Sequence, residues 1–567
     1  MSNSSSHDGA AGARPEHVDV VVVGAGFAGL YALHGLRERD LSARAFEEAG
    51  DVGGTWYWNR YPGARVDIES LQYCFHFSDV IREEWDWSER YASQPEILRY
   101  FDFVADRFDL RRDITFNSRV VSAVYSDEEN LWTVTTDKGD VAQGTYCIMG
   151  TGLLSAPYQP PFPGVEDFRG EWYHSSRWPH EKVELSGKRV GVVGTGSTGI
   201  QIIQTIAPEV AHLTVFQRTP NYATPGINRP LSKDENRAFN ARHDDWLREV
   251  HSMFSGQTSD FPAPTKSALE DSPEERRRWF QDRWDNGGHP QTLLYAYKDL
   301  LTDEKANETA CNFVRETIRA TVKDPVTAEL MCPKDEPLGA KRVPLEFGYF
   351  ETFNRDNVTL VDVKSAPIES FTENGLRTTN AEYELDVIIF ATGFDAITGA
   401  MSAIDIRCKG GPTLKELWTE GPKNYLGLMI AGMPNLFIIN GPGSAGIKAN
   451  NVLGVEHGIE WALSTLDHLV GNGFDRIEAD EQAEDEWIAH SNDVAEASLV
   501  SKAGSWYTGA NIPGKPQVFM PYFGGWPQYR EICKQAVADG YRGFHLSRSS
   551  ERGDTARTQL QAADIGR

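Results

Sequence analysis

The stretch VDVVVVGAGFAGLYALHGLRER, residues 18–39, decides the fold of the first part of the chain. An apolar run leads at once into a glycine-rich turn and then into apolar residues at helical spacing, and ARAFEE at 43–48 supplies the next short strand. This order of strand, turn, helix and strand is typical of a dinucleotide-binding unit. Its glycines allow a tight turn, close approach of a pyrophosphate, and packing of the helix on the strand.

The same pattern occurs a second time. KRVGVVGTGSTGIQIIQTIAPE at 188–209 is followed by the strand LTVFQRTP at 213–220. A further apolar run, YELDVIIFATGFD at 383–395, ends in a glycine turn. The sequence therefore predicts an α/β fold with two Rossmann-like dinucleotide-binding domains.

The two units differ in charge at the end of their second strand. Glu47 follows Gly24 by 23 residues, whereas Arg218 follows Gly194 by 24. A carboxylate at this position accepts hydrogen bonds from ribose hydroxyls and repels a 2′-phosphate, which a guanidinium binds. We therefore expect FAD in the first unit and NADPH in the second.

Composition shifts along the chain suggest domain boundaries. The Pro-rich PYQPPFPG at 157–164 resembles a domain crossing, and 231–330 is charged, with helical spacing. We expect a disordered tail at 1–16, an FAD domain at 17–156 and 382–546, an NADP domain at 157–230 and 331–381, a helical insertion at 231–330, and a flexible tail at 547–567.

Charge and composition narrow the possible partners. The formal net charge of −26 argues against nucleic acid and anionic membranes. No apolar run reaches the ~18 residues of a membrane span, and the N-terminus lacks an apolar signal core. The six cysteines form no CxxC pair and have no metal-ligand spacing. We expect a cytoplasmic protein, monomeric or weakly homo-oligomeric, without a metal.

Two dinucleotide sites in one chain imply hydride transfer from nicotinamide to flavin. A disulfide reductase needs a reactive cysteine pair beside the flavin, and this sequence has none. That leaves molecular oxygen as the expected electron acceptor.

Three motifs resemble those of type I Baeyer–Villiger monooxygenases. FRGEWYHSSRWP at 168–179 matches FxGxxxHxxxWP, the family fingerprint, through Phe168, Gly170, His174, Trp178 and Pro179. GTWYWNRYPGARVD at 54–67 matches GxWxxxxYPGxxxD, and ATGFD at 391–395 fits a third motif. SWYTGANIPGKP at 505–516 is also similar to the family. The resemblance covers residues 18–546 and is strongest to the phenylacetone and steroid monooxygenase branch.

The resemblance implies conversion of a ketone to an ester or lactone by an anionic flavin peroxide. Negative charge on the peroxide and on its ketone adduct requires a permanently positive group close by. The resemblance assigns this role to Arg342, with Asp67 as the partner that orients it. Arginine suits the role because it cannot lose its proton.

The resemblance and the glycine motifs together give a set of cofactor contacts. The expected FAD contacts are Gly24, Gly26, Ala28, Gly29, Glu47, Thr55, Trp56, Tyr57, Trp58, Asp67, Tyr73, Val120 and Asn451. The expected NADP contacts are Thr195, Gly196, Ser197, Thr198, Gly199, Gln201, Arg218, Thr219, Lys341, Arg342 and Trp506.

The loop GPGSAGIKAN at 441–450 is expected to line the ketone pocket through Ser444, Ala445, Gly446 and Ile447. It has the longer form found in the phenylacetone branch, so we expect aryl or bulky cyclic ketones, and expect a large side chain at Gly446 to exclude them. His174 is interpreted as a hinge residue and not as a general base. N- or S-oxygenation by a related flavin monooxygenase is the main alternative, and an NADPH oxidase or non-catalytic flavoprotein is a further one.

Overall fold

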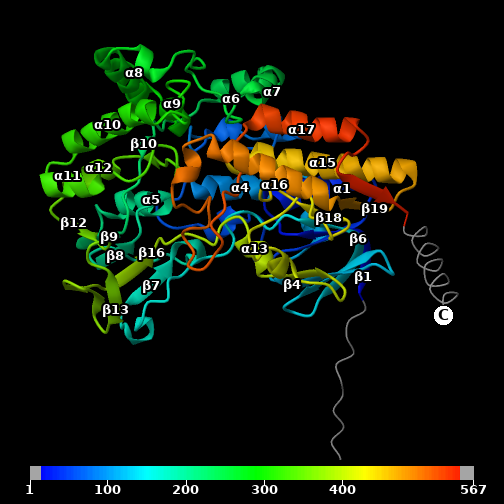
Figure 1. The fold of residues 1–567 in the computed structure, drawn as a ribbon. Helices are drawn as coiled ribbons and strands as arrows, with labels where there is room; N and C mark the ends of the chain where they lie inside the picture. Colours follow the sequence, from blue (N-terminus) through cyan, green and yellow to red (C-terminus); the bar gives the residue numbers. More distant parts are fainter. Residues whose placement is uncertain (1–14, 549–567) are drawn as a thin grey trace, which may run out of the picture.

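Two units of strand, glycine turn, helix and strand form the framework of the molecule (Figure 1). The computed structural model describes residues 15–548. The first unit contains β1 (Glu16–Val23), α1 (Phe27–Arg37) and β2 (Ala43–Phe46). The second contains β8 (Arg189–Val193), α5 (Ser197–Ile206) and β9 (His212–Gln217). Since β1 pairs in parallel with β2 and β8 with β9, the prediction of two Rossmann-like units is confirmed.

The first sheet has eight strands in the order β17-β4-β5-β6-β1-β2-β3, and β18 also pairs with β6. Its core strand β1 ends in four fully or nearly buried valines, because helices and strands cover both faces. The remaining strands of this sheet are β3 (Ile114–Thr115), β4 (Val120–Ser126), β5 (Leu131–Thr136), β6 (Val141–Met149), β17 (Asp405–Cys408) and β18 (Leu436–Ile438).

The second sheet has five parallel strands in the order β12-β9-β8-β16-β7. β16 (Val387–Phe390) lies between the central strand β8 and the edge strand β7, and its four side chains are all buried. The domain boundary expected at residue 382 is therefore wrong, because this apolar strand completes the second unit and not the first. The other strands are β7 (Glu171–His174) and β12 (Val358–Asp362).

Smaller elements flank the two sheets. β13 (Ile368–Thr372), β14 (Gly375–Thr378) and β15 (Glu382–Glu384) form an antiparallel sheet, β10 (Thr224–Pro225) pairs with β11 (Leu345–Glu346), and β19 (Arg476–Ala479) pairs with β20 (Phe544–Ser547). The short helices are α2 (Thr55–Trp58), α3 (Asp79–Glu84), α12 (Tyr349–Thr352), α13 (Gly399–Ser402) and α14 (Leu414–Leu417). The longer helix α4 (Gln94–Arg107) lies in the first unit.

The predicted insertion at 231–330 is helical, as expected, but it serves both units. Helices α6 and α7 pack against α3 and α17 (Trp526–Ala538) of the first unit, whereas α8 and α10 pack against β10 and α12 beside the second (Figure 1). The helices are α6 (Lys233–Ala241), α7 (His243–Ser252), α8 (Pro273–Asn286), α9 (Pro290–Leu294), α10 (Glu304–Thr321) and α11 (Pro325–Met331), the last one extending to the insertion's end.

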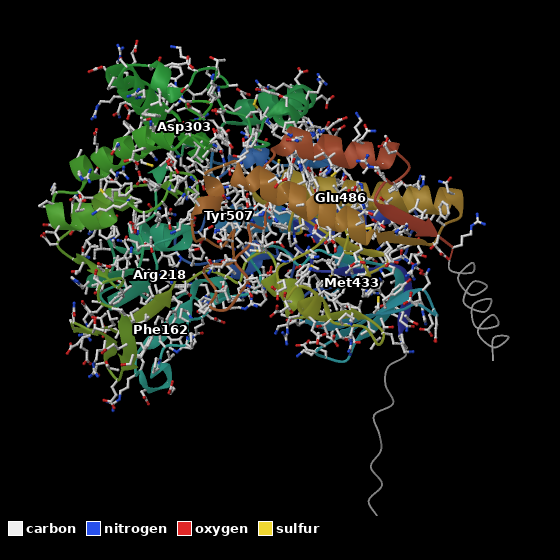
Figure 2. The ribbon with its side chains drawn as sticks, in the orientation of Figure 1. Phe162, Arg218, Asp303, Met433, Glu486 and Tyr507 are labelled. Carbon is white, nitrogen blue, oxygen red and sulfur yellow. The ribbon has the colours of Figure 1, made fainter. Side chains whose placement is uncertain are left out.

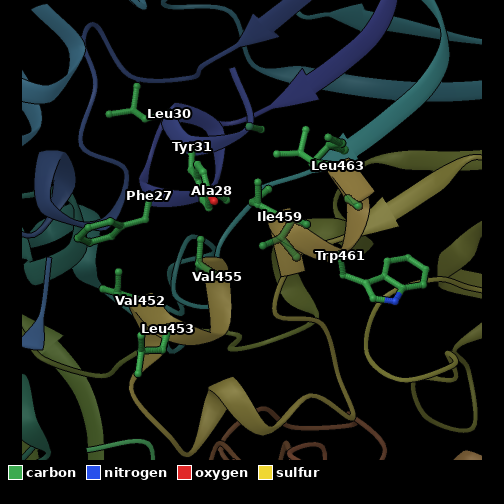
Figure 3. Close-up of a cluster of buried hydrophobic side chains, with 14 of the residues drawn as sticks. Phe27, Ala28, Leu30, Tyr31, Val452, Leu453, Val455, Ile459, Trp461 and Leu463 are labelled. Carbon is green, nitrogen blue, oxygen red and sulfur yellow. The ribbon is translucent and has the colours of Figure 1, made fainter. Parts of the chain in front are cut away.

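The largest apolar core lies where α1 packs against α15 (Asn451–Asn472). Figure 3 shows Phe27 and Tyr31 of α1 beside Val455 and Ile459 of α15. The helices approach closely because Gly35 presents no side chain, and a Cβ there would lie 2.2 Å from Leu463 Cδ1. This contact fixes the helix that follows the first glycine turn. The other C-terminal helices are α16 (Glu481–Glu496) and α17 (Trp526–Ala538).

The crossing from the first sheet to the second and the return crossing after β16 are hydrogen-bonded to each other. The amide of Tyr158 donates to the carbonyl of Gly393 (3.0 Å), and that of Asp395 donates to the carbonyl of Ala156 (2.9 Å). The Pro-rich segment 157–164 is thus a crossing, as predicted, and ATGFD is part of the return crossing.

The expected tails, 1–16 and 547–567, lie almost wholly outside the described residues, although β1 begins at Glu16 and β20 ends at Ser547. Among residues 15–548, no helix combines the length and apolarity needed to cross a membrane.

Candidate active site

A cavity of about 890 Å³ lies between the two units and is lined by both glycine turns. Arg218 reaches it from the second unit, and Trp506 reaches it from the segment before α17. Figure 2 shows Arg218 on the second unit and Tyr507, which follows Trp506, on the chain between the units. The cavity is large enough for cofactor-sized ligands, which commonly bind at such domain junctions.

The first glycine turn has the shape that a pyrophosphate requires. Gly24 has φ of +99°, and a Cβ there would lie 2.6 Å from the carbonyl oxygen of Gly150. A Cβ on Gly29 would lie 1.9 Å from the carbonyl oxygen of Gly24, so α1 can approach the turn only with glycine at this position. Gly26 and Ala28 at the start of α1 line the cavity. The backbone amides of the first helical turn therefore face the space where an anion would bind.

Glu47, the residue directly after β2, stabilises this turn. Its carboxylate is buried and accepts hydrogen bonds from the amides of Ala25 and Ala49, both at 2.7 Å. Burial raises the pKa of Glu47, and the two amides oppose that rise. Each carboxylate oxygen keeps a further lone pair for a ribose hydroxyl.

The second turn repeats this geometry. Gly194 has φ of +111°, and a Cβ on Gly199 would lie 2.1 Å from the carbonyl oxygen of Gly194. At Gly196, by contrast, a Cβ would meet no protein atom within 4 Å. The open space at Gly196 is therefore available to a bound ligand. Both glycine turns have the shape that a dinucleotide requires.

Most predicted cofactor contacts meet at this cavity. Those on its wall are Gly24, Gly26, Ala28, Glu47, Thr55, Trp56, Trp58, Asp67, Tyr73, Val120, Asn451, Thr195, Gly196, Ser197, Thr198, Gln201, Arg218, Thr219, Lys341, Arg342 and Trp506. Gly29 and Gly199 lie behind the turns, where they allow the helices to approach. Tyr57 does not line the cavity; its ring packs against Trp58 and Arg60, which sets it apart from the other predicted flavin contacts.

The two cations expected at the 2′-phosphate differ in their partners. Arg218 is exposed and has no ion-pair or hydrogen-bond partner among residues 15–548. Lys341 also lines the cavity, but its ammonium pairs with Glu336 at 2.6 Å. Arg218 is therefore the freer of the two to bind an incoming phosphate.

Arg342 and Asp67 form a two-pronged ion pair at the cavity wall. Arg342 Nε donates to Asp67 Oδ2 at 3.0 Å, and a terminal nitrogen donates to Oδ1. The Asp67 carboxylate raises the pKa of Arg342 above its ordinary value, and the hydroxyl of Tyr507 also faces this guanidinium. The guanidinium is therefore permanently charged and fixed in direction.

The five residues that match the fingerprint, His174 among them, hold the crossing segments and do not line the cavity. His174 Nδ1 accepts from the amide of Ser176 (3.3 Å), which leaves Nε2 to donate to the carbonyl of Tyr158 (3.1 Å). Thr392 Oγ1 lies 3.3 Å from the same Nε2. Burial lowers the pKa of His174. A neutral histidine that binds both crossings fits the hinge interpretation.

The remaining fingerprint residues are structural in this fold. Phe168 packs against Phe371, and Trp178 packs against Tyr173. A Cβ at Gly170 would lie 2.5 Å from the carbonyl oxygen of Asp386, so this glycine lets β7 enter the sheet. Pro179 follows Trp178 in the same loop.

A second, small cavity of about 50 Å³ adjoins Asp67 and Arg342. Aromatic side chains of Phe254, Tyr295 and Phe523 line it. Of the predicted pocket residues, Ala445 lines this cavity and Ile447 lines the large one.

Two of the predicted pocket residues point elsewhere. Ser444 donates its hydroxyl to Asn440 Oδ1 at 2.9 Å. A Cβ on Gly446 would lie 2.1 Å from the same oxygen and 2.7 Å from Gly454 Cα of α15. Gly446 therefore faces the interior, and the expectation that its side chain would fill the ketone pocket is wrong.

Replacing Gly446 with phenylalanine should destabilise the protein and should not change its selectivity between large and small ketones. Overpacking against Asn440 and α15 is expected to cost about 3 kcal/mol or more. Thermal unfolding followed by flavin fluorescence measures this. Ala445→Leu, which faces the small cavity, is the matched comparison and should alter selectivity. Normal stability of Gly446→Phe with selective loss of bulky ketones would contradict this placement.

Sequence reasoning missed Tyr507 and Arg177. Tyr507 follows a predicted residue directly, so its position in SWYTG was the available signal. Arg177 lies within the fingerprint, lines the large cavity, and places its guanidinium 4.0 Å from the ring centre of Trp58. It joins the second unit to a predicted flavin-lining residue.

Comparisons with known proteins agree with this geometry. Residues 17–227 match the model of the flavin-binding monooxygenase-like family. A Baeyer–Villiger monooxygenase from Pseudooceanicola batsensis is 42% identical over 537 residues, which covers 94% of this chain and 97% of that protein. The chain belongs to the Baeyer–Villiger monooxygenase family.

Other relatives lead to the same family. The acetone monooxygenase (methyl acetate-forming) of a Gordonia species is 43% identical over 533 residues, covering 94% of this chain and 99% of that protein. An oxidized steroid monooxygenase solved with bound NADP is 48% identical, with a TM-score of 0.88 over 94% of this chain and 99% of that one. This Baeyer–Villiger monooxygenase is therefore an FAD-containing, NADPH-dependent enzyme, as the two glycine turns predicted.

Within this Baeyer–Villiger monooxygenase, Arg218→Ala should raise the KM for NADPH about 10- to 100-fold and leave that for NADH nearly unchanged. A charge-assisted contact with the 2′-phosphate is worth about 1.5–3 kcal/mol. Steady-state kinetics with both cofactors measures the difference.

Glu336→Gln is the matched variant, since it frees Lys341 from its carboxylate. It should lower the KM for NADPH. Equal effects of Arg218→Ala on NADPH and NADH would show that this residue does not recognise the phosphate.

Proposed function

We propose that this enzyme uses NADPH and molecular oxygen to convert ketones into esters or lactones at the Arg342–Asp67 pair. The observation that carries this proposal is the position of that pair. It lies on the wall shared by the large cavity, which both glycine turns line, and the small aromatic cavity. A ketone bound where the two cavities meet would thus lie beside a fixed positive charge.

FAD, when bound, supplies electron transfer from NADPH and the activation of oxygen. Gly24, Gly26, Glu47 and the residues from Thr55 to Trp58, other than Tyr57, would hold it in the first unit. The turn at Gly196 together with Arg218 would hold NADPH in the second. Trp506, on the cavity wall, would cover the nicotinamide end.

Arg342 would stabilise the negative charge that develops during oxygen transfer to the carbonyl. A unit charge at ~4 Å and an effective dielectric of ~20 contributes about 4 kcal/mol. Asp67 would act as a positioning residue, because both of its oxygens accept from the guanidinium and fix its plane. His174 would act only on the crossings between the units.

We further propose a preference for aryl or bulky cyclic ketones over short aliphatic ones. The aromatic rings of Phe254, Tyr295 and Phe523 support this, since offset and edge-on ring contacts add to apolar burial. The proposed setting is the cytoplasm, with the enzyme a monomer or weak homo-oligomer. The net charge of −26 supports the weak association, because self-repulsion opposes tight binding between copies of the chain.

N-oxygenation is the second candidate function. The relative named phenazine N-monooxygenase PhzNO1, from Lysobacter antibioticus, is 39% identical over 534 residues, covering 94% of this chain and 96% of that protein. A fixed guanidinium beside the cavity favours ketone over amine substrates, because nucleophilic attack on a carbonyl builds up negative charge.

Aerobic incubation of the purified enzyme with NADPH and panels of ketones, amines and sulfides tests the proposal. Mass analysis should show a gain of one oxygen on ketones, with the ester or lactone identified by its fragments. Oxygen gain on amines or sulfides alone would support the alternative. Hydrogen peroxide without any oxygenated product would contradict both.

A further inference from the structure

Lys448 occupies an unusual place in the ketone pocket. It lies at the end of the loop 441–450, just before α15, and its side chain lines the small cavity together with Arg342 and Asp67. The loop around it is otherwise made of small, apolar and amide residues. The ammonium group thus enters a cavity whose other walls are largely aromatic.

The ammonium of Lys448 has no anionic partner. The two other cations that line this cavity are paired, Arg342 with Asp67 and Lys341 with Glu336. Within residues 15–548, the ammonium of Lys448 forms neither an ion pair nor a hydrogen bond. Its Nζ lies 4.2 Å from the ring centre of Tyr507 and 5.8 Å from that of Phe523. These ring faces only partly replace lost hydration.

The surroundings of the ammonium lower its pKa. Burial, and next the charge of Arg342, lower the pKa of Lys448 to about 7. A half-buried cation without a counter-ion loses part of its hydration, and an anion bound beside it would offset that loss.

A second polar group in the same cavity also lacks a partner. Gln257 is buried and lines the cavity, and its Oε1 has no hydrogen-bond partner among the described residues. Gln291 Oε1, on the same wall, is in the same condition. Both unpartnered amide atoms are acceptors, so an anion in this cavity would bind to the ammonium of Lys448 and not to these oxygens.

We propose that Lys448 binds a carboxylate group of the substrate, so that this enzyme acts on ketones that bear a carboxylate. The inference rests on the proposed ketone oxygenation. The carboxylate would bind to Lys448 and the carbonyl would point to Arg342, so each cation would bind one polar group of the substrate. The cavity of about 50 Å³ can hold a carboxylate group but not a whole ring. The ring and its carbonyl would therefore lie on the other side of Arg342, in the adjoining cavity of about 890 Å³.

The test compares 4-oxocyclohexanecarboxylate with its carboxamide, which has nearly the same shape but no charge. Wild-type holoenzyme should show a higher kcat/KM for the carboxylate. In Lys448→Met the ratio of the two kcat/KM values should fall about 10- to 100-fold, the worth of one charge-assisted hydrogen bond. Lys448→Arg should retain part of the ratio. Lys423→Met, which removes a surface lysine paired with Asp485, is the matched control and should leave the ratio unchanged.

Calorimetric titration of oxidised holoenzyme with the carboxylate gives a readout independent of turnover. The Kd should rise by the same factor in Lys448→Met. If the wild type oxygenates the carboxamide but shows no preference for the carboxylate, the inference fails while the proposed function stands. If no ketone is oxygenated, the proposed function fails, and the calorimetric comparison still decides whether Lys448 binds the anion.

The pH dependence gives a further check. Above pH 7 the free enzyme loses the Lys448 proton, so the Kd for the carboxylate should rise, approaching tenfold per pH unit. The groups that face Lys448 include the ion pairs of Arg342 with Asp67 and of Lys341 with Glu336. The pKa values of Tyr507 and Tyr522 are raised to about 12, that of Tyr295 is raised, and those of His251 and His289 are lowered to about 4, so these tyrosines and histidines should not change charge between pH 6 and 9. A flat profile in the wild type would overturn the assignment.

Discussion

Replacing Arg342 with alanine should reduce ester formation about a thousandfold or more, while FAD remains bound. The guanidinium is expected to contribute about 4 kcal/mol to charge that appears only during oxygen transfer, and that energy corresponds to about three orders of magnitude in rate. NADPH consumption should fall far less than product formation. The measurement is therefore the amount of ester formed per NADPH consumed, with hydrogen peroxide assayed in parallel.

The ion pair makes controls necessary, because Arg342→Ala leaves the Asp67 carboxylate without its partner. Removing one member of a partly buried pair destabilises a protein by about 3–5 kcal/mol. The double variant Arg342→Met/Asp67→Leu removes both charges and should fold with FAD bound, yet form no ester. Arg342→Lys keeps the charge but loses the fork that both Asp67 oxygens accept from, so it should retain only part of the activity. Ester formation by Arg342→Ala at the wild-type rate would refute the role.

The features that sequence predicted well are those set by neighbouring residues. A glycine turn between a buried strand and a helix is determined within about a dozen positions, and both GAGFAG and GTGSTG adopt the predicted shape. The contrast between Glu47 and Arg218 could be read in the same way, since each lies at a fixed distance from its turn. Both positions lie on the cavity wall.

The features that sequence missed depend on contacts between distant segments. The apolar run at 387–390 gave no sign of which sheet it would join, and only pairing with Val190–Val193 and with β7 shows that it belongs to the second unit. Likewise, the small residues of the loop 441–450 suggested pocket space at Gly446. The space there is filled by Asn440 and by Gly454 of α15.

Side-chain direction explains the remaining differences. Tyr57 belongs to an aromatic run whose neighbours Trp56 and Trp58 line the cavity, but on a helix of four residues it points to another side. Lys448 directly follows the predicted pocket residues and is charged where its neighbours are not. That contrast was visible in the sequence, but the absence of a counter-ion could be seen only after folding.

Replacing Gly29 with alanine should remove FAD from the purified enzyme. The new Cβ would lie 1.9 Å from the carbonyl oxygen of Gly24, so either α1 or the turn must move. Movement of α1 is opposed by its packing against α15, and movement of the turn displaces the amides that would face the pyrophosphate. The flavin absorbance of the purified protein measures the loss.

Two further glycine substitutions separate the possible causes of that loss. Gly471→Ala, in α15, meets no atom within 4 Å; it should keep FAD, and the better helix propensity of alanine should stabilise it by about 1 kcal/mol. Gly196→Ala also meets no protein atom within 4 Å, so it should fold and keep FAD. Its methyl group, however, would occupy the space left for NADPH, and the KM for NADPH should rise.

If Gly29→Ala purified with a full complement of FAD, the close packing of α1 on the turn could not be what shapes the flavin site. Unchanged NADPH kinetics in Gly196→Ala would likewise show that the open space at this glycine is not where the second cofactor binds.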